Sequence, residues 1–176
     1  MIHFRFLVLI TASIALFLLL PAVPVFASTP KTVTFHSKEF GFSMKYPVSW
    51  TVLLHPDDSV LLLIQSPDGS SAISVGAVFV EDFSALSRLT ARTIEELNAA
   101  LKVLNTKSRK IKGLSAKEFF TTQVVDGEML KGKKIFIANG KAIYIFSFAS
   151  SPPNTYAKAL RVFDSFVRSL TVKKGK

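Results

Sequence analysis

The sequence predicts an α+β fold, an α/β/α sandwich in which helices flank a central, mostly antiparallel sheet. Short apolar-rich segments alternate with turn signals along most of the 176 residues. Two of these segments, 60–64 and 143–146, are apolar on both strand faces, so a layer must cover each side of the sheet. Two amphipathic segments are available to form these layers.

The chain begins with the pattern of an export signal. A cation at Arg5 precedes an apolar run over residues 6–20, and small residues stand at Val25 and Ala27. We therefore predict a signal peptide over 1–27, cleaved after Ala27, and an extracytoplasmic protein, periplasmic or secreted. The alternative is an uncleaved helix that tethers the protein to a membrane, because the apolar stretch approaches the ~20 residues that span a bilayer.

The rest of the chain has the length of one ordinary domain. We expect a short leader over 28–33, a single domain over 34–171 and a basic C-terminal tail over 172–176. The sequence contains no cysteine, so the domain core must supply the stability that disulfides provide in many exported proteins.

Turn residues divide the domain into strands. Pro67-Asp68-Gly69 suits a tight turn, and Asp126-Gly127 and Asn139-Gly140 are typical of two-residue hairpins. The predicted strands are 34–36, 42–46, 50–54, 60–65, 72–80, 116–124, 129–138 and 142–150.

Two helices are predicted. The first begins at Thr93, because the following residues have the form of a capping box. Its apolar face consists of Ile94, Leu97, Leu101 and Leu104. The second runs from about 155 to 170, with Asn154 or Thr155 as its N-cap. Its apolar stripe consists of Tyr156, Leu160, Phe163, Val167 and Leu170.

Aromatic residues on the strand patterns are expected in the core. Trp50, Tyr46 and Tyr144 could serve as ligand platforms, but residues at such positions more often pack in the interior. Phe119 and Phe120 are adjacent in one strand, so they must point to opposite faces of the sheet. Both are buried only if both faces are covered, in agreement with a sandwich.

The motif search indicates no catalytic residue and no cofactor. A cysteine nucleophile is impossible, no serine lies in a Gly-x-Ser-x-Gly elbow, and no glycine-rich phosphate loop is present. We therefore predict that the protein is not an enzyme. An extracytoplasmic hydrolase, with a site assembled across the fold, remains an alternative.

One segment has ligand types suitable for a divalent cation such as calcium. His55, Asp57 and Asp58 lie together between two predicted strands and are candidate metal ligands. Their spacing matches no dedicated loop, and Pro with Asp commonly builds a turn. A turn is the simpler interpretation.

The charge distribution indicates a partner. The formal net charge is +10, and the cations concentrate over 107–117, over 131–141 and in the tail. Four of them follow the first predicted helix with no acid among them and are the candidate partner-binding residues: Lys107, Arg109, Lys110 and Lys112. Such a surface attracts an acidic protein or an anionic membrane, or simply keeps the protein soluble. Export and the core-like spacing of the aromatics disfavour nucleic acid. We expect a monomer.

The segment Gly41-Phe42-Ser43-Met44-Lys45-Tyr46-Pro47-Val48-Ser49-Trp50 resembles the opening of PsbP-like domains, the PsbP/Mog-type sandwiches. The Phe-rich stretch 163–170 is similar to the closing helix of that family, and the resemblance covers 34–171. It implies an antiparallel sheet between helices.

Named members of the family are extrinsic lumenal subunits of photosystem II that support calcium and chloride retention. Many bacterial relatives are exported proteins without an assigned role. The resemblance implies an exported, non-enzymatic binding or accessory protein for an extracytoplasmic or membrane-associated partner. The alternative that it implies is a photosystem II accessory protein, calcium-linked, in a thylakoid lumen. No photosystem-contact or metal residue of the family is matched here.

Overall fold

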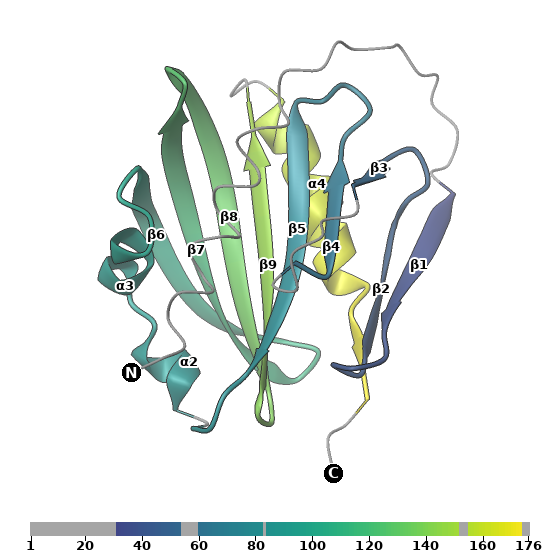
Figure 1. The fold of residues 1–176 in the computed structure, drawn as a ribbon, viewed down its shortest axis with the longest axis vertical. Helices are drawn as coiled ribbons and strands as arrows, with labels where there is room; N and C mark the ends of the chain where they lie inside the picture. The colour runs from purple at the N-terminus through teal and green to yellow at the C-terminus, as the bar shows by residue number, and fades with distance from the viewer. Residues whose placement is uncertain (1–30, 54–59, 83, 152–154, 174–176) are drawn as a thin grey trace.

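The computed structural model describes residues 31–53, 60–82, 84–151 and 155–173. Within these residues the strands form two antiparallel sheets (Figure 1). The larger sheet contains β3 (Thr51–Leu53), β4 (Leu62–Gln65), β5 (Ser71–Phe79), β6 (Leu101–Ile111), β7 (Leu114–Val125), β8 (Glu128–Asn139) and β9 (Ala142–Ser150). Its spatial order is β3-β4-β5-β9-β8-β7-β6.

The smaller sheet has the order β1-β2-β10 and contains β1 (Thr32–Ser37), β2 (Phe42–Pro47) and β10 (Thr171–Val172). The backbone N–H of Lys173 donates to the carbonyl of Gly41, which continues this contact past β10. Three helices complete the described structure: α2 (Ala85–Arg88), α3 (Ala91–Glu96) and α4 (Tyr156–Arg168). None of these helices is long and apolar enough to cross a membrane.

A hydrophobic core lies on each face of the larger sheet. On β9, Tyr144 and Phe146 belong to the core under α4 and the small sheet, whereas Ile143 and Ile145 belong to the core under α2 and α3. We call these two sides the α4 face and the α3 face. Figure 1 shows α4 behind the sheet and α3 beside β6. The predicted α+β sandwich is confirmed.

Helix α4 forms where the second helix was predicted. Its buried side is Ala159, Phe163, Phe166 and Val167, and the Phe163 ring stacks on Phe148 of β9 at 5.4 Å between ring centroids. Burying such a side chain stabilises the fold by about 1.5–3 kcal/mol. The helix ends at Arg168, where the Ser169 hydroxyl donates to the carbonyl of Phe166.

The predicted hairpins are confirmed. Asp126 and Gly127 have φ of 50° and 81°, the paired left-handed conformation that a two-residue turn between twisted strands requires. Asn139 pairs with Ala142 across the second predicted turn. Trp50 is only 7% exposed, and Tyr144 is fully buried. Their prediction as core residues is confirmed, and Tyr46 is half-buried beside the same core.

The first predicted helix is wrong in its start and its length. The cap is Thr90, whose hydroxyl accepts a hydrogen bond from the Thr93 N–H at 3.1 Å, and α3 ends at Glu96. Leu101 and Leu104 lie in β6, where Leu101 is buried and Leu104 is 66% exposed. The leucine spacing mimics a helix, but the residues from Leu101 onward pair with β7, and this pairing buries Leu101 in the core of the α3 face.

Phe119 and Phe120 point to opposite faces, as predicted, but only one lies in a core. Phe119 is fully buried on the α3 face, where its ring meets Phe136 edge-on at 5.7 Å. Phe120 is half-buried on the α4 face, in a part of the sheet that carries charged side chains.

Candidate protein-binding surface

The four predicted partner-binding cations lie on β6 and its turn, and not at the end of a helix. Pairing with β7 places Lys107 opposite Glu118 and Arg109 opposite Ala116, so both lie on the α4 face. Lys110 alternates to the α3 face, and Lys112 occupies the turn with φ of 53°. The cluster is therefore divided over both sides of one strand.

Strand β6 is the edge of the larger sheet, and the described residues place no strand on its outer side (Figure 1). Lys112 and Gly113 both have positive φ, as in a two-residue hairpin whose flanking residues exchange hydrogen bonds. Alternation along the strand then directs the backbone groups of Thr106, Ser108 and Lys110 toward the open edge. At the other end of β6, the Glu95 carboxylate accepts the Val103 N–H at 2.8 Å and closes that part of the edge.

The α4 face of β6, β7 and β8 holds a buried ion-pair network. The Glu118 carboxylate is 3% exposed and pairs with the Arg109 guanidinium and, at 3.5 Å, with the Lys133 ammonium. Lys133 also donates to the Asp164 carboxylate of α4 at 2.9 Å. Arg109 is thus held by the fold, because a buried carboxylate without its partner costs several kcal/mol.

Phe120 links this network to the edge strand. The ammonium groups of Lys107 and Lys133 lie 5.4 and 5.2 Å from its ring centroid, within the range of cation–π attraction. Lys107 is itself exposed, and no acid of the described residues pairs with it. The cations that remain available to a partner are Lys107, Lys110 and Lys112.

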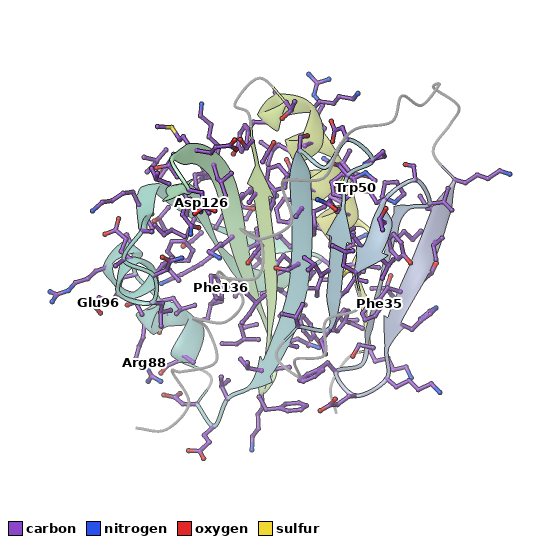
Figure 2. All side chains as sticks on the ribbon, turned by 45° about the horizontal axis from the view of Figure 1, so that its top comes forward. Phe35, Trp50, Arg88, Glu96, Asp126 and Phe136 are labelled. Atoms are coloured by element: carbon purple, nitrogen blue, oxygen red, sulfur yellow. The ribbon has the colours of Figure 1, made fainter. Side chains whose placement is uncertain are left out.

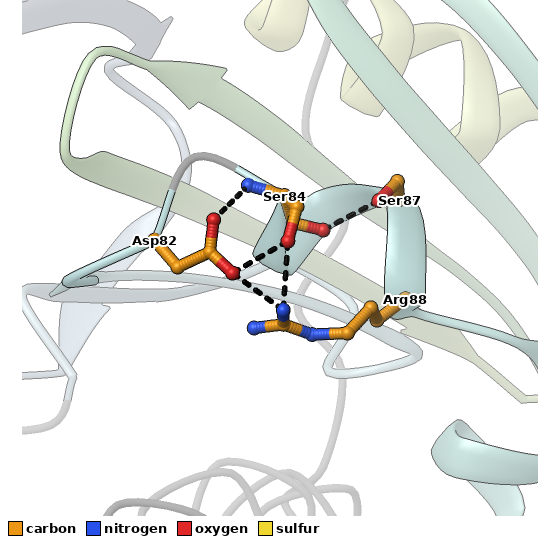
Figure 3. A network of polar contacts seen from close by, with 4 residues as sticks. All are labelled: Asp82, Ser84, Ser87 and Arg88. Atoms are coloured by element: carbon orange, nitrogen blue, oxygen red, sulfur yellow. Dashed lines mark hydrogen bonds and ion pairs between the residues drawn. The ribbon is translucent and has the colours of Figure 1, made fainter.

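The side chains around α2 and α3 form a second polar cluster, and its role is structural. Asp82 accepts hydrogen bonds from the Ser84 N–H at 2.7 Å and the Ser84 hydroxyl at 2.6 Å, and it pairs with Arg88 (Figure 3). These bonds lower the pKa of Asp82 to about 2. Figure 2 shows Arg88 and Glu96 pointing outward on this side of the molecule. The cluster fixes the start of the four-residue helix α2, which is also held by Leu86 in the core and by the Lys117 ammonium on the Ser87 carbonyl.

The α3 face contains a buried lysine of a different kind. Lys134 is 8% exposed, and its ammonium meets the Ser147 hydroxyl of β9 at 3.4 Å. No ion pair of the described residues includes it. Burial alone lowers the pKa of Lys134 to about 8.

The candidate metal ligands His55, Asp57 and Asp58 lie outside the described residues. Among the residues that are described, no group of three histidines or carboxylates is placed to hold a metal ion. The prediction of a turn at 55–58 therefore stays a prediction, as does the cation site.

Sequence reasoning missed the buried charges. Lys133 and Lys134 belong to the run 131–141, which was interpreted as part of a cationic surface, yet both are buried. The available signal was their position inside a predicted strand of a sheet that was expected to be covered on both faces, because alternation must place one lysine on each face. The partners of Lys133, Glu118 and Asp164, come from other elements and carry no local signal.

Comparisons with known proteins support the fold. No protein-family model matches the chain, and a search of curated proteins finds no match by sequence. The solution structure of cyanobacterial PsbP (CyanoP) from Synechocystis matches with a TM-score of 0.66 at 14% identity, over 86% of this chain and 98% of that one.

Two further solved structures match less closely. The Ran-binding protein Mog1p of Saccharomyces cerevisiae has a TM-score of 0.60 at 10% identity, over 82% of this chain and 96% of its own. LpqN of Mycobacterium tuberculosis, involved in cell envelope biogenesis, has a TM-score of 0.52 at 9% identity, over 83% and 92%. At such identities the similarity concerns the fold and not the activity. On this evidence the chain has a PsbP/Mog-like fold.

Proposed function

We propose that this protein is an exported, non-enzymatic accessory protein that binds an acidic segment of a protein partner outside the cytoplasm. The observation that carries the proposal is β6, an eleven-residue strand with four cations and no acid, exposed at the edge of the sheet. The location outside the cytoplasm rests on the export signal predicted over 1–27.

An edge strand of this kind suits the addition of one more strand. The outward backbone groups of Thr106, Ser108 and Lys110 can pair with an extended peptide, which gives affinity without any particular sequence. Cations on both sides of β6 then favour acids at successive positions of that peptide, because alternate residues face opposite sides. Lys107 would meet an acid on the α4 face and Lys110 one on the α3 face.

The same cations protect the edge when no partner is bound. Charged side chains on an exposed edge strand, lysine above all, oppose pairing with a second copy of the same strand. Like charges would be brought face to face in such a pair. A basic edge therefore selects acidic partners and agrees with the monomer expected from the sequence.

The structural neighbours agree with a binding role. One is described as a Ran-binding protein, and another is involved in cell envelope biogenesis. Neither description identifies a partner for this chain, because one fold serves many functions.

A photosystem II accessory role is the second candidate. It is favoured by the TM-score of 0.66 to cyanobacterial PsbP, the highest of the three similarities given above. Its test is simple: the protein would have to come from an organism with a thylakoid lumen and co-purify there with photosystem II.

Charge reversal at the edge tests the main proposal. Lys110→Glu with Lys112→Glu changes two exposed cations that make no ion pair among the described residues. Lys158→Glu with Arg161→Glu changes the net charge equally on the exposed side of α4 and is the matched control.

The binding probes are a short extended peptide in which pairs of adjacent Glu residues are separated by Val, so that acids face both sides, the same peptide with Gln in place of Glu, and vesicles with and without anionic lipid. We expect the wild type and the control to bind the acidic peptide in a salt-sensitive manner, and the edge variant to bind it at least tenfold more weakly. Equal binding by both variants would contradict the proposal, and binding only to anionic vesicles would replace the protein partner with a membrane.

A further inference from the structure

Three polar side chains form a row across the α3 face of the larger sheet. Lys134 of β8 lies directly opposite Ser147 of β9, and Ser147 lies opposite Ser74 of β5. Residues opposite each other in neighbouring strands share a face. The row continues into Phe119 and Leu63, both buried in the core of that face. Polar groups at this depth need hydrogen-bond partners.

The described residues leave this row short of partners. A lysine ammonium has three donors, and the single acceptor found for Lys134 is the Ser147 hydroxyl at 3.4 Å. The Ser74 hydroxyl is buried and forms no hydrogen bond with any described residue. Ser147 accepts from Lys134, so its own O–H remains available to donate. The row therefore presents donors and no negative charge.

A small cavity opens beside this row. Its volume is about 20 Å³, which accommodates one water molecule or one small ion. The polar side chains of the α3 face that line it are those of Thr121, Gln123, Lys134 and Ser147. Lys131 also borders the cavity, but its side chain alternates to the α4 face. No acidic residue lines the cavity.

Gly132 lines this cavity at a point where the strands β7, β8 and β9 pack closely. A Cβ at this position would lie 2.7 Å from the Thr121 Oγ1 atom and 2.8 Å from the Phe148 carbonyl oxygen. Any side chain there would displace the backbone of β9 or the threonine that lines the cavity. The glycine does not have a positive φ, so close packing explains its presence and a special backbone conformation does not.

We infer that this cavity binds one small monovalent anion, held by the Lys134 ammonium with the Ser147 hydroxyl as a further donor. A water molecule would supply acceptors but would leave the buried charge unbalanced. An anion supplies hydrogen-bond acceptors and also a negative charge, which neutralises the buried ammonium of Lys134. A divalent oxyanion such as sulfate would exceed the single positive charge that Lys134 supplies. This site is independent of the β6 edge and of its proposed partner.

The energetics of Lys134 support the inference. Burial lowers its pKa to about 8, so the amine is still mostly protonated at pH 7. No carboxylate lines the cavity, so the charge of Lys134 has no counterpart there. A site with this balance attracts anions and repels metal cations.

The test uses the purified full chain with bromide as the probe. Bromide replaces sulfate at constant ionic strength, and binding is followed by halide NMR line broadening and by melting temperature. The variants are Lys134→Met, which removes the charge, and Ser147→Ala, which keeps the charge and removes the hydroxyl. Lys141→Met is the matched control, because Lys141 is an exposed lysine in the turn that follows the same strand.

We expect broadening and a bromide-dependent rise in melting temperature for the wild type and Lys141→Met. Lys134→Met should lose both effects, and Ser147→Ala should bind bromide several-fold more weakly. If Lys134→Met does not fold, anomalous scattering from a bromide-soaked crystal of the wild type tests the site instead. We expect the bromide peak beside the Lys134 amine. The inference is overturned by a wild type that shows no broadening, by equal broadening in the lysine and serine variants and the control, or by no peak in the cavity.

Discussion

Lys133 and Lys134 are neighbours in β8, both are buried, and they lie in opposite electrostatic environments. On the α4 face Lys133 meets two carboxylates, Glu118 and Asp164. On the α3 face Lys134 meets one serine hydroxyl and no carboxylate of the described residues. One strand thus carries a neutralised charge on one side and an unbalanced charge on the other.

The comparison teaches which buried charges serve the fold. Lys133 ties α4 to the sheet through Asp164, and the same network holds Arg109 of the edge strand in place. Lys134 forms no ion pair among the described residues, contacts only the Ser147 hydroxyl of the neighbouring strand, and adds a desolvation cost. A buried charge that destabilises the fold and forms no ion pair indicates a ligand site. The same reasoning identifies active-site groups by their shifted pKa values.

The largest expected effect is that replacing Lys133 lowers the free energy of unfolding, whereas replacing Lys134 leaves it unchanged or raises it. Lys133→Met leaves Glu118 and Asp164 short of a partner, so we expect a loss of about 3–5 kcal/mol in the free energy of unfolding. Lys134→Met removes an unpaired buried charge at nearly constant volume and should be neutral or stabilising. Urea denaturation at pH 7 without halide measures both, and a similar loss in the two variants would erase the distinction.

The pH dependence of stability sharpens the comparison. The folded state lowers the pKa of Lys134 from 10.5 to about 8, so between these values the unfolded chain binds one more proton. Stability from this group therefore rises as the pH increases from about 8 to 10.5, by about 3 kcal/mol at 1.36 kcal/mol per pKa unit. The rise should be missing in Lys134→Met. Identical pH profiles for the variant and the wild type would mean that Lys134 titrates as an exposed lysine.

Adding a methyl group at Gly132, which lines the cavity, should have a smaller effect on stability than replacing Lys133. Gly132→Ala forces a contact with the Thr121 hydroxyl and with the Phe148 backbone, and we expect it to cost about 1–3 kcal/mol. Halide broadening should fall with it. Thr121→Ser keeps the hydroxyl and serves as the control for changes in the cavity lining. A stable Gly132→Ala protein that still binds bromide as the wild type does would show that the anion binds elsewhere.

The smallest expected effect concerns the exposed edge. Lys110→Glu with Lys112→Glu should change the free energy of unfolding by less than about 0.5 kcal/mol, because neither cation is paired or buried. Arg109→Glu, in contrast, would place a second carboxylate beside buried Glu118 and should destabilise the fold clearly. Thermal denaturation of the three proteins separates the cations that serve the fold from those that are free to bind.

Much of the fold could be predicted because its signals are local. Asp126-Gly127 and Asn139-Gly140 form the turns that their residue types favour, and the apolar stripe of α4 reflects one continuous helix. Strand β6 could not be predicted in the same way. Its leucine spacing matches a helix, and only the pairing with β7 decides the structure.

The sequence indicates which cations form the candidate surface, but not on which side of the sheet each of them lies. The absence of acids around Lys107 and Lys110 is visible in the sequence. Their separation onto two sides of an edge strand depends on β6 being a strand. The pairing of Arg109 with Glu118 depends on the register of the hairpin, and that of Lys133 with Asp164 depends on how α4 docks. Both pairings join residues from different elements, so they depend on tertiary structure and carry no signal in the local sequence.

The proposed partner-binding surface is the edge strand β6, and site-specific cross-linking tests this most directly. A photoreactive amino acid replaces the exposed Ser108 of β6 or, as the control, the exposed Val48 outside the larger sheet, in cells of the source organism. We expect an adduct from position 108 only, mapped by mass spectrometry to a segment rich in Asp and Glu, and lost when Lys110→Glu is added. No adduct at 108, or equal adducts from both positions, would contradict the account.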